Sequence, residues 1–329
     1  MKRPSSLALT ALLLLGCGGP PAEELWIYTS IYKEVYPLFE PGLAAAFPGV
    51  EFRWYQSGSE KIAAKILAEE RGGGTKADLL MTSDLFFYQE LEKLGLLLPL
   101  RGPVFDRVPA EYRDADGAFA VVRFPLMVIA YNHELVAGDD VPAGFEALLD
   151  PRYRGRLTMP SPLESGSTLT TVLYLHQRFG PSYFEGLRAN DVLAAGGNGA
   201  TLSRIQSGER PVGIVLLENV LKAKSLGLES VEVAFPQEGA LPIPSPLAIL
   251  KHTRDEDLAR RVLDWFFSKA ARKIVVRGFM HTAFPEDPPP AGAPAWTEIR
   301  RHPWDLETFE RWGEKRQEVK TLFQQIVLQ

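Results

Sequence analysis

The sequence of 329 residues is poor in the side chains that build common catalytic and metal sites. It has one cysteine, Cys17, so no disulfide framework can form, and its five histidines are scattered. His133-Glu134 lacks the second histidine of a zinc-protease helix, and neither a Gly-x-Ser-x-Gly elbow nor a P-loop occurs. These absences argue against a hydrolase. We expect a protein that is not an enzyme and that holds no cofactor and no metal.

Basic stripes and long hydrophobic runs are also missing. The formal net charge is -5, and removal of Lys2 and Arg3 with a signal peptide would take away two positive charges and make it -7. An acidic chain without a basic stripe argues against nucleic acid as a partner. After residue 17 no apolar run reaches transmembrane length. With 46% hydrophobic residues the chain can bury a sizeable core, and its length predicts two domains. We expect the protein to be a monomer.

The start of the sequence predicts the cellular compartment in which the protein is found. A short basic region and an apolar core too short to span a bilayer lead to Leu-Leu-Gly-Cys at residues 14–17. This motif resembles the lipobox of bacterial lipoproteins, although Leu15 is bulkier than usual at its position. We expect residues 1–16 to be a signal peptide, Cys17 to be the acylated residue and residues 17–24 to be a tether. The protein would then be anchored in the periplasm or cell envelope; cleavage of the signal elsewhere is the alternative.

The segment after the tether alternates strands and helices. Strands are expected at residues 25–29, 50–56 and 77–82, each followed by a helix. This order predicts a parallel sheet, and ligands favour the carboxyl ends of its strands. Small hydroxyl residues directly follow the three strands, which makes them ligand candidates, although such residues are common in any loop. They are Ser30, Ser57 and Ser83.

Two Ser-Gly-Ser motifs each precede a helical pattern, more than a hundred residues apart. They are Ser57-Gly58-Ser59 and Ser165-Gly166-Ser167, the second continued by Thr168. A helix start presents unpaired backbone N–H groups and the positive end of the helix dipole, which together favour an anion. Gly166 has no side chain and would let a ligand approach the backbone. We expect one small anionic ligand between the motifs; the alternative is that the serines only cap their helices.

The remaining segments predict how two domains are joined. Residues 118–132 are almost continuously apolar and indicate a strand that leaves the first domain and continues into the second. Arg123, the only cation on that strand, would pair the anion bidentately or form a salt bridge across the hinge. Asn198, in a glycine-rich helix start, is a further ligand candidate. The expected domains are residues 25–123 with 247–329, completed by amphipathic helices at 255–278 and 306–327, and residues 124–246.

Several segments together resemble the bacterial extracellular solute-binding proteins of ABC importers, in particular the ferric-iron, phosphonate and sugar-phosphate binding group. The resemblance covers nearly everything after residue 24. It implies an α/β clamshell of the type II periplasmic-binding class, with two mixed, mostly parallel sheets flanked by helices, two hinge crossings and a ligand in the cleft. It also implies delivery to a membrane permease. The segments that carry it are Leu25–Ser30, Lys76–Leu80, Val128–Asn132, Pro160–Ser167, Pro242–Pro246 and Leu263–Lys269.

One position departs from the iron-binding members. Their pair of adjacent tyrosines, which the resemblance places after the strand at 212–217, is replaced here by Glu218-Asn219. Ferric iron prefers anionic oxygen ligands, and we expect Tyr28 and Tyr32 to be packing residues and not replacements. A carboxylate at Glu218 would repel an anion unless the ligand also carries an amine or hydroxyls, as an aminoalkylphosphonate or a sugar phosphate does. Glu218 facing solvent at a helix start is the other interpretation.

The sequence therefore predicts a binding lipoprotein that captures a small anionic solute of the phosphonate or sugar-phosphate type. Three alternatives stay open: a ferric-iron binding protein, a periplasmic hydrolase, and a ligand-sensing lipoprotein that docks onto a membrane sensor.

Acylation of Cys17 can be checked directly, because a thiol that follows a signal core is a lipidation site. We expect the intact mass of the protein from a membrane fraction to begin at Cys17 and to include acyl chains. A soluble product that begins several residues later would contradict this prediction.

Overall fold

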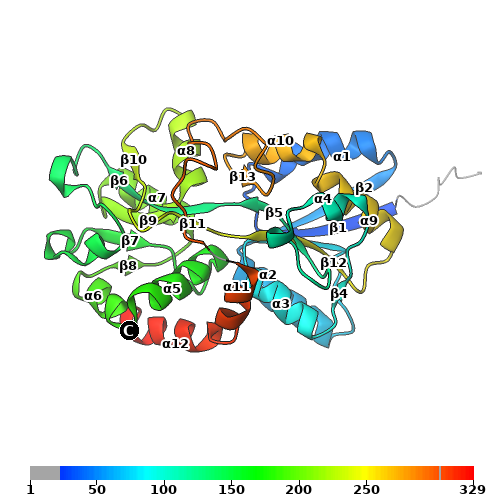
Figure 1. Cartoon of the computed structure of the whole chain (residues 1–329), viewed down its shortest axis with the longest axis horizontal. Helices are drawn as coiled ribbons and strands as arrows, with labels where there is room; N and C mark the ends of the chain where they lie inside the picture. The colour runs from blue at the N-terminus through cyan, green and yellow to red at the C-terminus, as the bar shows by residue number, and fades with distance from the viewer. Residues whose placement is uncertain (1–22, 304) are drawn as a thin grey trace, which may run out of the picture.

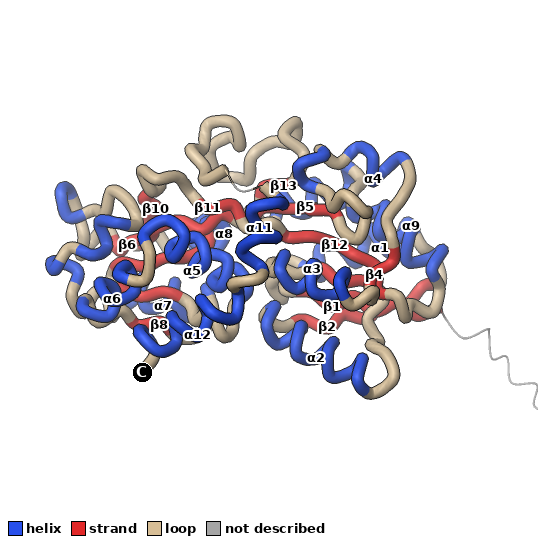
Figure 2. Tube along the Cα trace, turned by 60° about the horizontal axis from the view of Figure 1, so that its bottom comes forward, coloured by secondary structure: helices blue, strands red, loops and turns tan. Residues whose placement is uncertain are grey.

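The computed structural model describes residues 23–303 and 305–329. They form two lobes, each a sheet covered by helices (Figures 1 and 2). Cys17 and most of the expected tether lie outside the described residues, and Glu23 and Glu24, also expected in the tether, instead begin the first strand. Within the described part of the chain, no helix combines the length and apolarity needed to cross a membrane.

The first lobe is built on a sheet of order β13-β5-β12-β3-β1-β2, with β4 beside β12. Strand β1 pairs in parallel with β2 and β3, so their carboxyl ends meet at one edge, as predicted. The strands are β1 (Glu23–Thr29), β2 (Val50–Gln56), β3 (Leu79–Met81), β4 (Leu97–Leu98), β5 (Ala120–Phe124), β12 (Ser245–Leu250) and β13 (His281–Thr282). The helices are α1 (Glu40–Ala46), α2 (Ser59–Arg71), α3 (Leu85–Lys93), α4 (Pro103–Arg107), α9 (Glu256–Phe266) and α10 (Lys269–Arg277).

The second lobe has a sheet of order β10-β6-β9-β7-β8, with β11 beside β6. Strand β7 is parallel to β8 and β9, whereas β6 is antiparallel to β9. Across the two described sheets four strand pairings are parallel and seven are antiparallel, so the sheets are mixed but not mostly parallel as expected, because the crossing strands and their neighbours run antiparallel. The strands are β6 (Leu126–Asn132), β7 (Leu157–Met159), β8 (Leu193–Ala194), β9 (Val212–Leu216), β10 (Val231–Ala234) and β11 (Leu241–Pro242). The helices are α5 (Gly166–Phe179), α6 (Ser182–Ala189), α7 (Asn198–Ser207) and α8 (Leu217–Ser225).

Two extended segments cross between the lobes. Strand β5 of the first sheet is followed, after Pro125, by β6 of the second sheet, as the apolar run predicts. Pro125 has no N–H to donate, so the ladder of the first sheet ends there. The return crossing runs from β11 to β12, and the N–H of Ile243 donates to the carbonyl oxygen of Pro125 at 2.8 Å. The two crossings are thus hydrogen-bonded to each other at the hinge.

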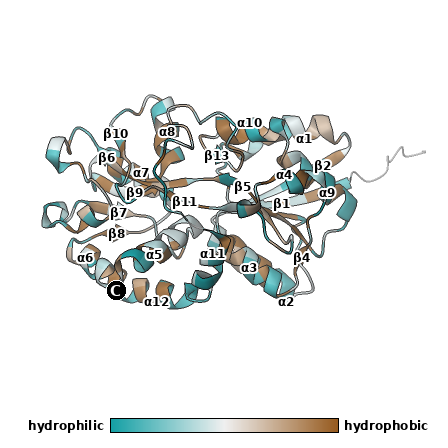
Figure 3. Ribbon diagram, in the orientation of Figure 1, coloured by the Kyte–Doolittle hydropathy of each residue, from teal (hydrophilic) through white to brown (hydrophobic). Residues whose placement is uncertain are grey.

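Continuous apolar runs explain why the central strands are buried on both faces. Strands β3, β9 and β12 are buried along their whole length. In Figure 3 the hydrophobic colour gathers on the strands at the centre of each lobe, and the outer turns are mainly hydrophilic. The two sheets, whose central strands are buried, therefore give the loops at their edges a rigid support.

The C-terminal helices differ from the expectation that residues 306–327 complete the first domain. They form α11 (Leu306–Gly313) and α12 (Arg316–Val327). Helix α11 does pack on α3 of the first lobe, where the rings of Phe86 and Phe309 are 5.4 Å apart. Helix α12 instead packs on α5 and α6 of the second lobe, where Phe323 meets Phe184 edge-to-face at 5.2 Å. An amphipathic pattern shows that one helix face is buried but not which lobe covers it.

Charged groups tie α12 back to the first lobe. Nη2 of Arg316 lies 2.8 Å from Glu60 on α2 and 2.9 Å from Asp84 at the start of α3. Lys320 also pairs with Glu60. The side chain of Asp84 is fully buried, and burial raises the pKa of its carboxyl to about 6 although Arg316 acts in the opposite direction. We call Glu60, Asp84, Arg316 and Lys320 the interlobe ion cluster.

Replacement of Arg316 by methionine is expected to lower the free energy of unfolding by about 3–5 kcal/mol, because Asp84 and Glu60 would keep buried negative charge without their main partner. The folded pKa of Asp84 already lies above its unfolded value and would rise further. The folded variant would therefore take up protons, and its stability deficit should shrink between pH 8 and pH 5.

Urea unfolding at both pH values measures this effect. The exposed Arg311 on α11 supplies the matched control, since Arg311→Met should change stability by less than about 0.5 kcal/mol. Equal stability of the Arg316 variant and the parent would show that the cluster contributes nothing.

Candidate functional site

A cavity of about 480 Å³ lies between the lobes. The first lobe lines it with the loops that follow β1, β2 and β3, and the second lobe lines it with the starts of α5, α7 and α8. Ten of the twelve residues predicted from the sequence line this one cavity. They are Ser30, Ser57, Gly58, Ser59, Ser83, Arg123, Ser165, Ser167, Asn198 and Glu218.

The serines of the first lobe leave hydroxyl groups free for a ligand. The side chains of Ser57 and Ser59 form no hydrogen bond with any described residue, and Ser59 does not cap α2, whose cap position is Gly58. Oγ of Ser30 accepts from the N–H of Ser83 at 3.0 Å, which joins the loops after β1 and β3. The capping interpretation therefore does not hold for Ser59.

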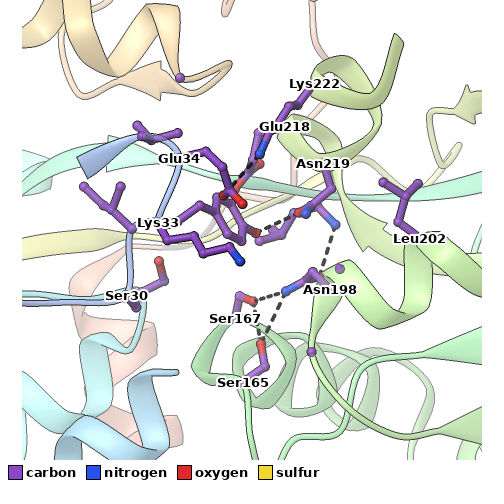
Figure 4. A pocket seen from close by; sticks show the side chains of 18 of the residues that line it. Ser30, Lys33, Glu34, Ser165, Ser167, Asn198, Leu202, Glu218, Asn219 and Lys222 are labelled. Carbon is purple, nitrogen blue, oxygen red and sulfur yellow. Dashed lines mark hydrogen bonds and ion pairs between the residues drawn. The ribbon is translucent and has the colours of Figure 1, made fainter. Parts of the chain in front are cut away.

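The second-lobe motif both caps its helix and lines the cavity. Oγ of Ser165 accepts from the N–H of Thr168 at 3.4 Å, so Ser165 is the cap of α5. It also lies 2.9 Å from Oγ of Ser167, and Nδ2 of Asn198 is 3.4 Å from Ser167 (Figure 4). The N–H of Leu216 donates to Oδ1 of Asn198 at 3.3 Å and fixes its amide. Asn198 thus links the starts of α5, α7 and α8.

Gly166 and Thr168 are not among the residues that line the cavity. A Cβ atom on Gly166 would lie 2.9 Å from Cβ of Ser59, and one on Gly58 would lie 2.5 Å from the carbonyl oxygen of Glu164. The close approach expected of a ligand at Gly166 is therefore made by the opposite lobe. Thr168 is fully buried in the second lobe, where its hydroxyl has no hydrogen-bond partner among the described residues.

Two opposite charges are buried at the floor of the cavity. Arg123 is 2% exposed and Glu218 is 3% exposed, so Glu218 does not face solvent. Arg123 donates to Oγ of Ser83 at 3.1 Å and forms no ion pair within 4.0 Å, so it makes no salt bridge across the hinge in the described part of the chain. Its Nε, like Oε1 of Glu218, has no hydrogen-bond partner there.

The protonation of Glu218 is set mainly by its burial. Burial raises the pKa of its carboxyl to about 7, while backbone N–H groups and Arg123 oppose this shift. Near neutral pH the group can therefore accept a proton or release one at small cost, and it can accept or donate a hydrogen bond.

Tyr32 is a pocket residue that the sequence analysis treated as packing. It follows β1 in the same loop as Ser30, and its hydroxyl donates to Oδ1 of Asn219 at 2.7 Å across the cleft. Burial and the nearby Glu218 raise the pKa of its phenol well above the usual value, so it stays a neutral donor. Tyr28, in contrast, is buried outside the cavity and donates to Glu69, as expected of a packing residue.

Charged side chains lie at the mouth of the cavity. Glu34 of the first lobe pairs with Lys222 of α8 at 3.1 Å, a second contact that joins the lobes. Lys33 extends into the space between them (Figure 4). No motif marks these positions in the sequence, apart from their place after a strand or near a helix start. Over residues 23–303 and 305–329, no cluster of three histidine, cysteine or acidic side chains could hold a metal ion.

Known proteins share this architecture. A family model for bacterial extracellular solute-binding proteins matches residues 74–306. Iron uptake protein A1 of Synechocystis is 24% identical over 294 residues, 80% of this chain and 79% of that protein. A putative 2-aminoethylphosphonate-binding periplasmic protein of Salmonella typhi is 22% identical over 240 residues, 69% of this chain and 67% of that protein.

Among solved structures, the periplasmic binding protein AfuA of Actinobacillus pleuropneumoniae, with fructose-6-phosphate bound, aligns with a TM-score of 0.81. At 22% identity the alignment covers 93% of this chain and 99% of AfuA. This likeness confirms the expected two-lobed α/β binding-protein fold. Because the family model spans most of the sequence, the chain belongs to the bacterial extracellular solute-binding proteins.

Proposed function

We propose that this protein is the solute-binding component of an ABC importer and captures a small anionic solute of the phosphonate or sugar-phosphate type. It would act as a monomer in the periplasm, anchored through Cys17, and deliver the solute to a membrane permease. The observation that carries the proposal is the buried guanidinium of Arg123, whose Nε has no hydrogen-bond partner among the described residues, in the cavity that is also lined by the free hydroxyls of Ser57 and Ser59.

Electrostatics at the floor favour an anion. A buried cation without an ion pair is costly, and an anionic ligand would supply the missing charge and accept from Nε. The starts of α2 and α5 converge on the same cavity from opposite lobes, with Ser59 and Ser167 beside them. Their unpaired N–H groups and dipoles add to the attraction.

Glu218 restricts which anionic ligands the cavity can bind. Its unpaired Oε1 is buried in the cavity and would repel a ligand that only accepts hydrogen bonds. An amine or a hydroxyl on the ligand would satisfy this oxygen. Aminoalkylphosphonates and sugar phosphates combine such a donor with the anionic group. One relative is named as a putative 2-aminoethylphosphonate-binding protein, and AfuA, which has this fold, was solved with fructose-6-phosphate bound.

Ferric iron is the second candidate, because one relative is an iron uptake protein. Hard ferric iron prefers several anionic oxygen ligands. Here Glu218-Asn219 stand where the family resemblance implies two tyrosines, and the phenol of Tyr32 stays protonated and donates to Asn219. The cavity therefore offers the carboxylate of Glu218 and that of Glu34, which is already paired with Lys222, together with a buried cation, and this combination disfavours a trivalent metal.

Calorimetric titration with 2-aminoethylphosphonate and fructose 6-phosphate tests the proposal. At least one of the two should bind, and Arg123→Gln should weaken it by about 2–5 kcal/mol, or roughly 30-fold or more. Ser167→Ala should weaken it roughly ten- to a hundredfold, through loss of a hydrogen bond to a charged group.

The cap of α10 provides the matched control. Ser268 accepts from the N–H of Ala271 and lies outside the cavity, so Ser268→Ala should lose about 1 kcal/mol of stability and keep the parent's affinity. Variants at Arg123 and Ser167 that melt earlier yet bind like the parent would refute the site.

Ferric iron should bind weakly or not at all, because two phenolates are replaced by Glu218-Asn219. Addition of ferric citrate to the purified protein should produce no visible phenolate-to-iron absorption band. A tight, coloured complex would overturn the anion proposal in favour of iron uptake.

A further inference from the structure

The two ends of the cavity differ in chemistry. The floor is polar and charged. At the mouth, besides the charged Lys33, Glu34 and Lys222, four residues of the second lobe form an apolar side, which we call the apolar wall. The wall consists of Leu202 on α7, Ala223 on α8, and Leu226 and Leu228 in the segment after α8. Leu226 is 68% exposed and Leu228 is 50% exposed, which places both among the most exposed large apolar side chains of the described residues.

The wall begins one helical turn away from the floor. Asn198, at the start of α7, contacts Ser165 and Ser167, and Leu202 lies four residues further along the same helix face (Figure 4). Four residues of helix span about 6 Å. On α8, Glu218 likewise lies at the floor and Ala223 lies beyond the next turn. A ligand that leaves the floor along α7 therefore meets Leu202, whereas one that leaves along α8 passes Asn219 and Lys222 before it reaches Ala223.

The size of the cavity leaves room for such a ligand. Its volume of about 480 Å³ falls within the range of roughly 300–1,000 Å³ that is typical of pockets for small organic ligands. This volume is larger than a single phosphonate group occupies. Sugar hydroxyls placed against Leu202 or Leu226 would lose their hydrogen bonds to water without replacement. An alkyl or aromatic group there would be removed from water together with the leucines.

We propose that the solute carries an apolar portion that lies against the apolar wall while its anionic group is held at the floor. The ligand class is then an organophosphonate or organophosphate with an alkyl or aromatic body, and Leu202, Leu226 and Leu228 determine this specificity. The inference rests on the proposed function, because the floor must hold the anion.

Titration of the mature protein with methyl-, propyl-, hexyl- and phenylphosphonate, and with glucose 6-phosphate, tests the wall. Affinity should rise roughly three- to fourfold for each added methylene group, and hexyl- and phenylphosphonate should bind more tightly than the sugar phosphate. The double variant Leu226→Ser/Leu228→Ser should reduce the ratio of hexyl- to methylphosphonate affinity at least tenfold. Leu94→Ser, at a leucine that is 56% exposed and outside this cavity, should leave the ratio unchanged.

The possible failures are distinct. If the protein bound all four phosphonates with equal affinity, and if Arg123→Gln abolished that binding, the proposed role of the apolar wall would be refuted and the anion site would stand. Tighter binding of glucose 6-phosphate than of hexylphosphonate, or a chain-length gain that survives the double variant, would also refute the wall. Absence of binding by every compound would overturn both the wall and the proposed function.

Discussion

The contact between the two Ser-Gly-Ser motifs sets the distance between the lobes. Gly58 lies against the carbonyl oxygen of Glu164, and Gly166 lies against Ser59 and Asp84, with no room for a Cβ atom at either glycine. A side chain there would separate the lobes and open the cavity to solvent. The hydroxyls on both sides of these glycines are thereby brought to a single cavity from two different sheets. Small residues at this contact thus allow the two lobes to approach closely enough to form the cavity.

Charge is arranged on both sides of this contact. Toward the cavity lies Arg123, which has no ion pair in the part of the chain that the structure describes. On the other side lies the interlobe ion cluster, in which Arg316 pairs with Asp84 and Glu60. Arg123 donates to Ser83, and the next residue in the sequence, Asp84, pairs with Arg316 of α12. A ligand bound to Arg123 would therefore lie close to the ion pair that ties α12 to the first lobe. The C-terminal helix is therefore part of the interlobe structure and not an appendage of one lobe.

Local patterns in the sequence were enough to predict the sheets and most of the cavity. The strand at residues 50–56 matches β2 at both ends, because its alternation and flanking turns define it locally. The cavity residues were found because they follow parallel strands or begin helices. Contacts between distant segments were not predictable: nothing in residues 306–327 encodes that α12 packs on α5. Tyr32 and Gly166 were misjudged for the same reason, since their partners come from the opposite lobe.

Closure of the lobes has a cost that a ligand can remove. Tyr32 with Asn219 and Glu34 with Lys222 hold the lobes together, yet in this arrangement Nε of Arg123 and Oε1 of Glu218 are buried without hydrogen-bond partners among the described residues. Each such group costs about 1–3 kcal/mol, so the two together oppose closure by on the order of 2–6 kcal/mol. A shift from 1:99 to 99:1 between two states requires about 5.5 kcal/mol of differential affinity. A solute that pairs both groups would supply on the order of 2–6 kcal/mol toward that difference, and one that pairs only Arg123 would supply about 1–3 kcal/mol. Selection of the solute and closure of the lobes would then depend on the same two atoms.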